Sequence, residues 1–342
     1  MLLIVAAVVH LMTLLLGAAV VMLLLSGAWR GFKIAGGLVG GGLLYLLLPR
    51  FAPSKPEGLV LTRTDAPELW RLVEEVAAAA GSRSPDRIEL DSFVNATWGH
   101  VGVRRRRVLT LGYPLWAAME GQQKVALLGH EVGHEVNGDN SRSWFVWNAN
   151  RALYEWRSAV QPAFHPLGGL IELVAFVFQV LLLVALLPLG GILVLLRGRI
   201  EQLSARTSMH AEYRADALGA RLAGRNAAER FERLLLSPDV MHAAVLTSLR
   251  ADREADIWAV TKQHVRTVPA SEERRQLRLA ATTLHSIDAT HPATARRIEM
   301  LATLPDEAPA VTLDPERERV IDAEIRAHTA WVRRRLLDEI WS

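Results

Sequence analysis

Two histidines one helical turn apart, with a glutamate beside the first, are the residues of this sequence best suited to catalysis. They lie in the segment His130-Glu131-Val132-Gly133-His134. Side chains four positions apart project from the same face of a helix, so both imidazoles can bind one metal ion. Glu131 then lies where it can act on a water molecule held by that metal. Taken alone, the motif is also compatible with a helix that carries two surface histidines.

The residues around this motif favour a buried site over a surface helix. Residues 125–128 are Val-Ala-Leu-Leu, and Val132 lies within the motif. A buried pair of histidines needs a polar or metallic partner. Catalytic zinc takes three protein ligands and leaves a fourth position open. The sequence must therefore supply a third ligand from another segment.

Two carboxylates one helical turn apart offer that ligand. Glu212 and Asp216 belong to the segment Glu-Tyr-Arg-Ala-Asp in a later predicted helix and share one face of it. Metal-bound histidines usually donate their second ring N–H to a carboxylate or a carbonyl. We therefore expect Glu212 to bind the metal and Asp216 to hold a histidine. Without the histidine motif, such an acidic pair would indicate only a solvated helix face.

Four blocks of sequence carry a resemblance to a known family. They are Asn95-Ala96, HEVGHEVNGD at 130–139, EYRADALG at 212–219, and His291-Pro292 followed by Arg297-Ile298. In this order they resemble the membrane zinc metalloproteases of the HtpX and CAAX-prenyl-protease type, which are gluzincins. The resemblance covers about residues 85–300, and the second and third blocks are its specific part. One departure is Thr97-Trp98, because the family often has an aromatic residue directly after Asn-Ala.

The resemblance implies one Zn²⁺ ion per chain and roles for further residues. Glu212 would be the third ligand and Asp216 would support a ligand. His291 and Arg297 would face the cleft, where they could stabilise an oxyanion or control access. His291 is equally compatible with an ordinary helix start before a proline. Asn95 and Ala96 would belong to the strand that holds the substrate as an added strand.

The expected reaction is hydrolysis of a peptide bond. Zinc lowers the pKa of bound water towards neutrality and polarises the peptide carbonyl. Glu131 would accept the proton of the attacking water and pass it to the leaving amine. The developing oxyanion needs a further donor, for which His291 and Arg297 are the candidates.

Apolar stretches at the N-terminus predict a membrane anchor. Residues 1–28 contain no Asp, Glu, Lys or Arg and are long enough to cross a hydrocarbon core of about 30 Å. They lack the basic start and the small-residue cleavage site of a signal peptide. Residues 34–48 are apolar and rich in glycine, which allows two helices to approach closely in lipid. We therefore predict a transmembrane helical hairpin at 1–52.

A third apolar stretch, Leu167 to Leu196, separates His134 from Glu212. If both residues bind one ion, the chain must cross the bilayer an even number of times between them. Two arms of about fifteen residues span only about 22 Å each, which is short of a full crossing. We therefore predict a re-entrant or thinned-bilayer hairpin at 166–197, with its turn between 185 and 191. The alternative is one long apolar helix in a soluble core.

The remaining sequence predicts a predominantly α-helical α+β fold with a zincin-type metalloprotease domain at 53–305. Residues 88–103 and 108–111 alternate loosely and predict a small antiparallel sheet, with the arginines at 104–107 near its turn. Those arginines fit a solvated loop, or next a contact to anionic lipid heads. Residues 306–342 would form a C-terminal amphipathic helix over 317–341.

Charge and composition narrow the functional classes. A net charge of +3 gives no support for nucleic-acid binding, and the absence of cysteine excludes disulfides and a cysteine nucleophile. Basic residues after the second apolar stretch favour a cytoplasmic catalytic domain at a bacterial inner membrane.

The expected protein is a membrane-anchored zinc endopeptidase that cleaves protein or peptide substrates, including membrane proteins, in quality control. One alternative is a processing protease for a lipidated peptide. The other is a non-catalytic zinc-containing adaptor, although a structural site would not need Glu131. The sequence leaves the oligomeric state open.

Overall fold

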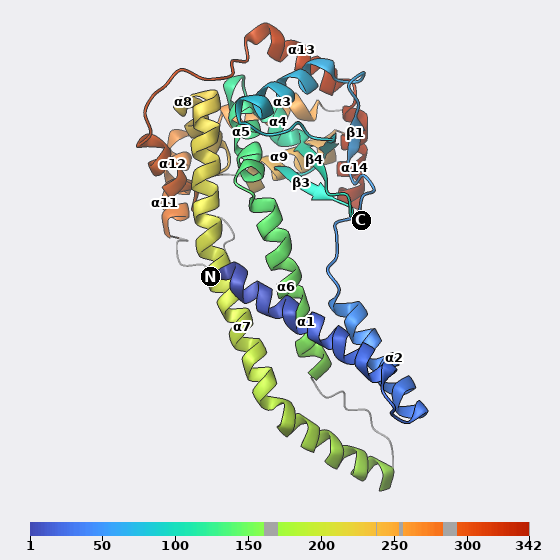
Figure 1. Ribbon diagram of the computed structural model, residues 1–342. Coiled ribbons are helices and arrows are strands. Elements are labelled where there is room, and N and C mark those ends of the chain that lie inside the picture. The colour runs from blue at the N-terminus through green and yellow to red at the C-terminus, as the bar shows by residue number, and fades with distance from the viewer. Residues whose placement is uncertain (161–169, 237, 253–255, 283–292, 342) are drawn as a thin grey trace. The chain divides into compact units, whose positions relative to one another are not determined.

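The computed structural model describes residues 1–160, 170–236, 238–252, 256–282 and 293–341 (Figure 1). The chain forms two compact units, each with its own cluster of buried apolar side chains. The first unit consists of residues 1–50 and 141–206, and the second consists of residues 51–140 and 207–342.

Two N-terminal helices of the first unit, α1 (Leu2–Leu25) and α2 (Arg30–Leu47), run antiparallel and pack on each other through glycines (Figure 1). A Cβ atom at Gly36 would come within 2.4 Å of Leu23 Cδ2, and one at Gly40 within 2.5 Å of Val20 Cγ2. The glycines therefore let the two backbones approach closely. Helix α1 is long and apolar enough to cross a membrane, and most of it is not buried by protein.

Helix α6 (Asp139–Val160) holds the end of α2 through polar side chains. Arg151 Nη1 donates to the carbonyl of Leu46 at 2.7 Å, and the other terminal nitrogen donates to the carbonyl of Leu48. The Oδ1 atom of Asn148 accepts a hydrogen bond from the backbone N–H of Arg50 at 2.7 Å. The last carbonyls of a helix lack partners within it, so these side chains satisfy groups that would otherwise need water.

Helix α7 (Leu170–Ala223) contradicts the hairpin predicted at 166–197. The helix continues through the proposed turn at 185–191, including Pro188. A proline removes one backbone hydrogen bond and often bends a helix without ending it, and α7 curves along its first half (Figure 1). The chain therefore leads away from His134 along α6 and returns to Glu212 along α7. The connection at 161–169 lies outside the described residues.

The second unit contains a four-stranded sheet in the order β1-β2-β4-β3. Its strands are β1 (Leu59–Leu61), β2 (Arg87–Asp91), β3 (Ala96–Val101) and β4 (Arg106–Gly112). The predicted antiparallel hairpin is confirmed as β3–β4, with arginines at its turn. The sheet as a whole is mixed, because β2 pairs with β4 in parallel, so the prediction of an antiparallel sheet was wrong. The segment between β2 and β3 lets β3 pair with the far side of β4, which makes β3 an edge strand.

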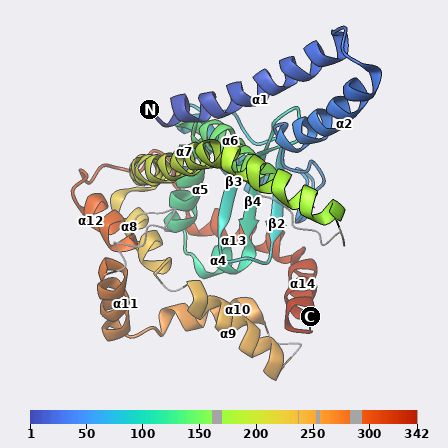
Figure 2. The same ribbon diagram turned by 90° about the horizontal axis from the view of Figure 1, so that it is seen from below.

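Helix α5 (Gln122–Val136) lies beside β3 and also packs against α3 and α8 (Figure 2). Val125, Leu128 and Val132 are fully buried, as the apolar spacing predicts. The other helices of this unit form a shell around α5 and the sheet: α3 (Pro67–Ala79), α4 (Tyr113–Ala118), α8 (Arg225–Leu234), α9 (Pro238–Ala251), α10 (Ile257–Arg266), α11 (Ala270–Thr282) and α12 (Thr294–Ala302).

The C-terminal segment is two helices, α13 (Pro315–Arg326) and α14 (Thr329–Trp341), where the sequence predicts one. Both belong to the second unit and not to a separate domain. The buried Nζ of Lys124 on α5 lies 2.9 Å from Glu318 and 2.6 Å from Asp322 of α13. Burial acts to raise the pKa of Glu318, but the Gly121 amide and Lys124 lower it overall. The C-terminal segment therefore fixes the start of α5.

Candidate metal centre

Small residues bring α5 and α7 together backbone to backbone. A Cβ atom at Gly133 would lie 2.8 Å from the Cα of Ala215, and one at Gly219 would lie 2.9 Å from the carbonyl oxygen of Ala126. Real Cβ atoms do not make such contacts, so both positions require glycine at this separation. This contact places the histidines of α5 beside the carboxylates of α7.

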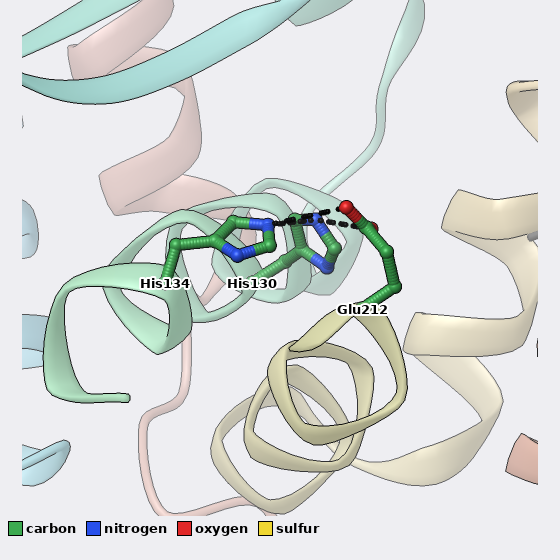
Figure 3. A group of neighbouring side chains, drawn as sticks. All are labelled: His130, His134 and Glu212. Carbon is green, nitrogen blue, oxygen red and sulfur yellow. Dashed lines mark hydrogen bonds and ion pairs between the residues drawn. The ribbon is translucent and has the colours of Figure 1, made fainter. Parts of the chain in front are cut away.

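The three predicted metal ligands converge on one point (Figure 3). The Nε2 atoms of His130 and His134 are 3.2 Å apart. Glu212 lies opposite them, with 3.5 Å from its Oε2 to His130 Nε2 and 3.7 Å from its Oε1 to His134 Nε2. Two nitrogens bound to one tetrahedral zinc at about 2.05 Å would be separated by about 3.3 Å. The observed spacing therefore fits a single zinc-sized ion.

Asp216 contacts the Nδ1 atom of His130, the second ring nitrogen, which is the position expected for it from the sequence. Its Oδ1 atom lies 2.8 Å from His130 Nδ1. Burial acts to raise the pKa of Asp216, but hydrogen bonds from Arg297 and His130 outweigh it and lower the pKa to about 2. The ionised carboxylate favours the tautomer with hydrogen on Nδ1, which leaves the Nε2 lone pair free for a metal.

His134 has its own carboxylate, which the sequence reasoning missed. Asp139 Oδ2 lies 3.4 Å from His134 Nδ1, and Arg214 lies 3.5 Å from Asp139 Oδ1. Burial acts to lower the pKa of His134, but Asp139 and the nearby carboxylates raise it overall. Asp139 belongs to the block at 130–139 that carried the resemblance. Its place at the start of α6, just after the motif, was the available signal.

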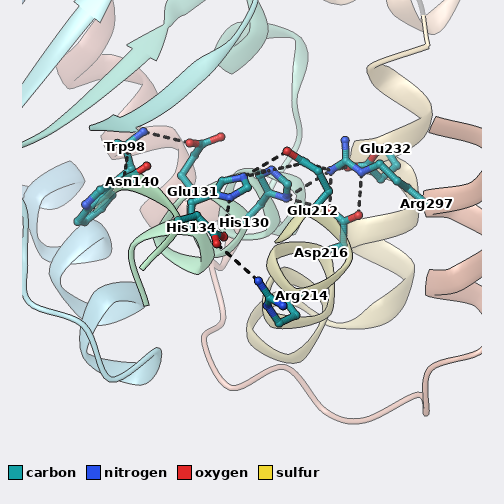
Figure 4. A network of polar contacts seen from close by, with 11 residues as sticks. Trp98, His130, Glu131, His134, Asn140, Glu212, Arg214, Asp216, Glu232 and Arg297 are labelled. Atoms are coloured by element: carbon teal, nitrogen blue, oxygen red, sulfur yellow. Dashed lines mark hydrogen bonds and ion pairs between the residues drawn. The ribbon is translucent and has the colours of Figure 1, made fainter. Parts of the chain in front are cut away.

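Glu131 lies on the side of the ligands that faces the sheet. Its Oε2 atom accepts a hydrogen bond of 3.1 Å from the backbone N–H of Trp98 on β3 (Figure 4). Burial raises the pKa of Glu131, and the charge of Glu212 adds to this effect. A carboxylate with a raised pKa is a stronger base, which suits a group that must accept a proton.

A second side chain binds the same residue of β3. Asn140 Nδ2 donates to the carbonyl of Trp98 at 2.7 Å and lies 3.3 Å from Glu135 Oε2. Side chains from α5 and α6 therefore form hydrogen bonds with both the backbone N–H and the backbone carbonyl of Trp98 at the edge of the sheet. The sequence reasoning did not identify Asn140, because no local pattern links it to residue 98.

Asn95 and Ala96 lie where β3 begins. The carbonyl of Asn95 accepts a hydrogen bond from Gly112 N–H at 2.8 Å, and its Oδ1 accepts one from the Ala96 amide at 2.8 Å. A Cβ atom at Gly112 would come within 1.9 Å of the Phe93 carbonyl oxygen, so glycine is required there. The structure thus puts Ala96 at the start of the edge strand that contacts Glu131 through Trp98, with Asn95 directly before it. Contact of these two residues with substrate stays a prediction.

Arg297 occupies a different position from the one predicted. Figure 4 shows it beyond Glu212 and Asp216, on the other side of the ligands from Glu131. Its Nε donates to Asp216 Oδ2 at 2.7 Å, and its Nη2 lies 2.8 Å from Glu232 Oε1. This geometry does not fit an oxyanion donor. It makes Arg297 a positioning residue for the ligands.

Glu232, on α8, is buried, and burial raises its pKa to about 8 although Arg297 opposes the shift. The sequence reasoning missed Glu232, since an isolated glutamate on a polar helix carries no signal. His291 lies outside the described residues.

The charges also fit a bound cation. The buried carboxyl groups of Glu212, Asp216 and Glu232 surround the guanidinium of Arg297, and the buried carboxyl group of Glu131 lies on the other side of the ligands. The excess of negative charge in a region of low dielectric would be costly without compensation. A divalent cation held by the two imidazoles and Glu212 would offset it.

This fold and site are those of a metalloprotease. Residues 63–304 match peptidase family M48, and the chain belongs to that family. The matched segment includes all of the site described above. The chain is therefore a metalloprotease, a hydrolase of peptide bonds.

Two relatives carry the same family resemblance. A protease HtpX homolog from Pyrobaculum calidifontis is 27% identical over 253 residues, which cover 70% of this chain and 68% of that protein. Protease HtpX from Acinetobacter baylyi is 23% identical over 279 residues, which cover 77% of this chain and 82% of that protein. Together with the apolar helix α1, these similarities support a membrane-associated protease.

We expect Gly219→Ala to weaken metal binding although it changes no ligand. The added methyl group would push α7 away from the Ala126 carbonyl, and so move Glu212 from the histidines. A shift of a few tenths of an ångström should lower zinc affinity at least tenfold, which is the effect that substitution of residues that orient metal ligands usually has. Zinc titration with a competing chelator measures this.

The matched control is Gly198→Ala on the same helix. A Cβ atom there meets nothing within 4 Å. Alanine also favours a helix over glycine by about 1 kcal/mol. This variant should keep wild-type zinc affinity and equal or higher thermal stability. Equal zinc affinity in both variants would contradict the close-contact explanation.

Proposed function

We propose that this protein is a zinc-dependent endopeptidase anchored in the membrane by its N-terminal helices. The observation that carries the proposal is the spacing of the three ligand atoms, with the two Nε2 atoms 3.2 Å apart and Glu212 within 3.7 Å of both. His130, His134 and Glu212 would hold the ion. Zinc bound there would supply Lewis acidity toward the peptide carbonyl and activate water.

Glu131 is the base and the proton carrier in this proposal. Its carboxylate lies beside the ligands and is oriented by the Trp98 amide at 3.1 Å. It would take the proton of the attacking water and deliver it to the leaving nitrogen. A non-catalytic zinc adaptor would not require this carboxylate, so the geometry favours the enzyme.

Membrane and misfolded proteins are the proposed substrates, in a quality-control role. The apolar, largely exposed helix α1 supports anchoring, because such a helix is long enough to span the bilayer. We further propose that the anchor lies in a bacterial inner membrane with the protease unit in the cytoplasm. The excess of basic residues after α2 supports this orientation.

Removal and return of the metal test the zinc assignment. The full chain, purified in detergent, should contain one zinc per chain by elemental analysis. Dialysis against a chelator should abolish cleavage of casein, and one equivalent of zinc should restore it, whereas magnesium should not. Undiminished cleavage by the metal-free protein would contradict the proposal.

A further inference from the structure

The tip of the β3–β4 hairpin carries an unusual concentration of positive charge. The tip consists of residues 102–106, Gly-Val-Arg-Arg-Arg, and Val103 there is 77% exposed. Arg104 and Arg106 are exposed, and in the described part of the chain neither lies within ion-pair distance of a carboxylate. The next residue, Arg107, pairs with Asp86 at 3.6 Å. The charges of Arg104 and Arg106 are therefore available to an external anion.

The backbone of the tip also points to a use for its side chains. Arg105 has a φ of +49°, a conformation that glycine or asparagine adopts with little strain. Apart from glycines, it is the only residue with positive φ in the described part of the chain. Strained residues of this kind tend to be kept where the side chain has a function.

A backbone hydrogen bond joins the tip to the segment that follows the N-terminal helices. The backbone N–H of Gly102 donates to the carbonyl of Ala52 at 2.9 Å. Helix α2 ends at Leu47, five residues earlier, and an extended chain spans at most about 3.6 Å per residue. Ala52 thus lies no more than about 18 Å from the end of α2. A membrane that holds α2 would be within reach of the tip.

We propose that the tip, residues 102–106, docks on the phosphate groups of anionic lipids at the membrane surface. The proposal rests on the membrane anchoring given under the proposed function. Arginines suit this contact because the guanidinium binds phosphate through paired hydrogen bonds. Each basic residue close to an anionic surface favours the bound state about fivefold. Val103 would then enter the headgroup layer between the arginines.

Docking of the tip would also orient the protease. Strand β3 runs from Ala96 to the tip and includes Trp98, whose amide binds Glu131. Lipid contact would therefore hold the edge strand beside the bilayer, where segments leaving the membrane could reach it. Peptide segments that emerge from the membrane would then be the favoured substrates.

A single fluorescent label at Val103 tests the docking. The chain contains no cysteine, so Val103→Cys gives one labelling site, and Val320→Cys on α13 gives a matched exposed control. Both full-length proteins would carry an environment-sensitive dye in nanodiscs of phosphatidylglycerol or of phosphatidylcholine. We expect a blue shift and quenching by lipid-borne quenchers only for residue 103 in phosphatidylglycerol. Adding Arg104→Gln and Arg106→Gln should lower the docked-to-free ratio about 25-fold.

Other outcomes would overturn the proposal in distinguishable ways. A protein retained in nanodiscs whose label at 103 stays in water, or responds equally in phosphatidylcholine, would contradict the docking alone. A blue shift unchanged by the two arginine substitutions would also contradict it, as would a shift produced by a soluble oligonucleotide in place of the lipid. A protein not retained in nanodiscs would contradict the anchoring itself. Casein cleavage in the same samples reports separately on the enzyme.

Discussion

Glu131→Gln is expected to abolish peptide hydrolysis while the protein keeps its zinc and its thermal stability. Glutamine has the size of glutamate, and its amide oxygen can still accept the hydrogen bond from the Trp98 amide. It cannot take a proton from water, so the general-base contribution is lost. We expect kcat/KM to fall by about 10²–10⁴ or more.

The measurement combines casein cleavage, zinc content and melting temperature on the same preparation. Glu135→Gln is the matched control, since it removes one negative charge from the same helix, four residues further on. Its carboxylate contacts Asn140 and His100, not the metal ligands, and its cleavage rate should stay within a few-fold of wild type. Wild-type cleavage by Glu131→Gln with zinc bound would refute the role of this residue.

The pairing of the candidate metal-site residues within each helix could be predicted from the sequence because helix geometry is local. Four-residue spacing places His130 with His134, and Glu212 with Asp216, whatever the rest of the fold does. The way in which the two helices meet is not local. It depends on Gly133 and Gly219, whose importance appears only when the opposing backbone is seen.

The supporting charges could not be predicted, because they come from segments that meet only in three dimensions. Glu232 and Asp139 belong to separate helices, and no regular sequence interval relates one to the other. Arg297 was associated with the site by resemblance, but the direction in which its side chain points depends on which carboxylates lie around it. A sequence pattern can place a residue near a site without giving the side on which it lies.

Two errors in the fold prediction have a common cause. Proline and glycine near position 188 suggested a turn, yet a long helix can continue past them when only one backbone hydrogen bond is lost. The parallel pairing of β2 with β4 likewise depends on contacts beyond each strand. Local signals describe where a chain can bend or pair, and tertiary packing decides whether it does.

Arg297→Gln is expected to destabilise the protease unit and to lower zinc affinity together. Arg297 is 5% exposed and its guanidinium contacts Asp216 and Glu232, so its removal leaves buried carboxylates without a counter-charge. Loss of one partner from a buried ion pair costs about 3–5 kcal/mol. Asp216 would also lose the group that orients it toward His130. Thermal unfolding and zinc titration measure the two effects, and Arg214→Gln, about half exposed, is the milder control.

The pH dependence of Arg297→Gln follows from the raised pKa of Glu232. In the wild type burial holds that pKa near 8, and loss of Arg297 would raise it further. The folded protein then binds a proton that the unfolded chain releases at neutral pH. The stability of the variant should therefore fall as pH rises from 6 to 9.

A second substitution separates the positioning role of Arg297 from a catalytic one. If excess negative charge causes the loss, Glu232→Gln added to Arg297→Gln should restore part of the stability and of the zinc affinity. A coupling of about 0.5–3 kcal/mol between the two sites is expected, because the side chains are in direct contact. If Arg297 instead stabilised an oxyanion, the single variant would lose kcat at unchanged melting temperature and zinc content. Glu232→Gln would then restore nothing, because it supplies no donor to the reacting carbonyl.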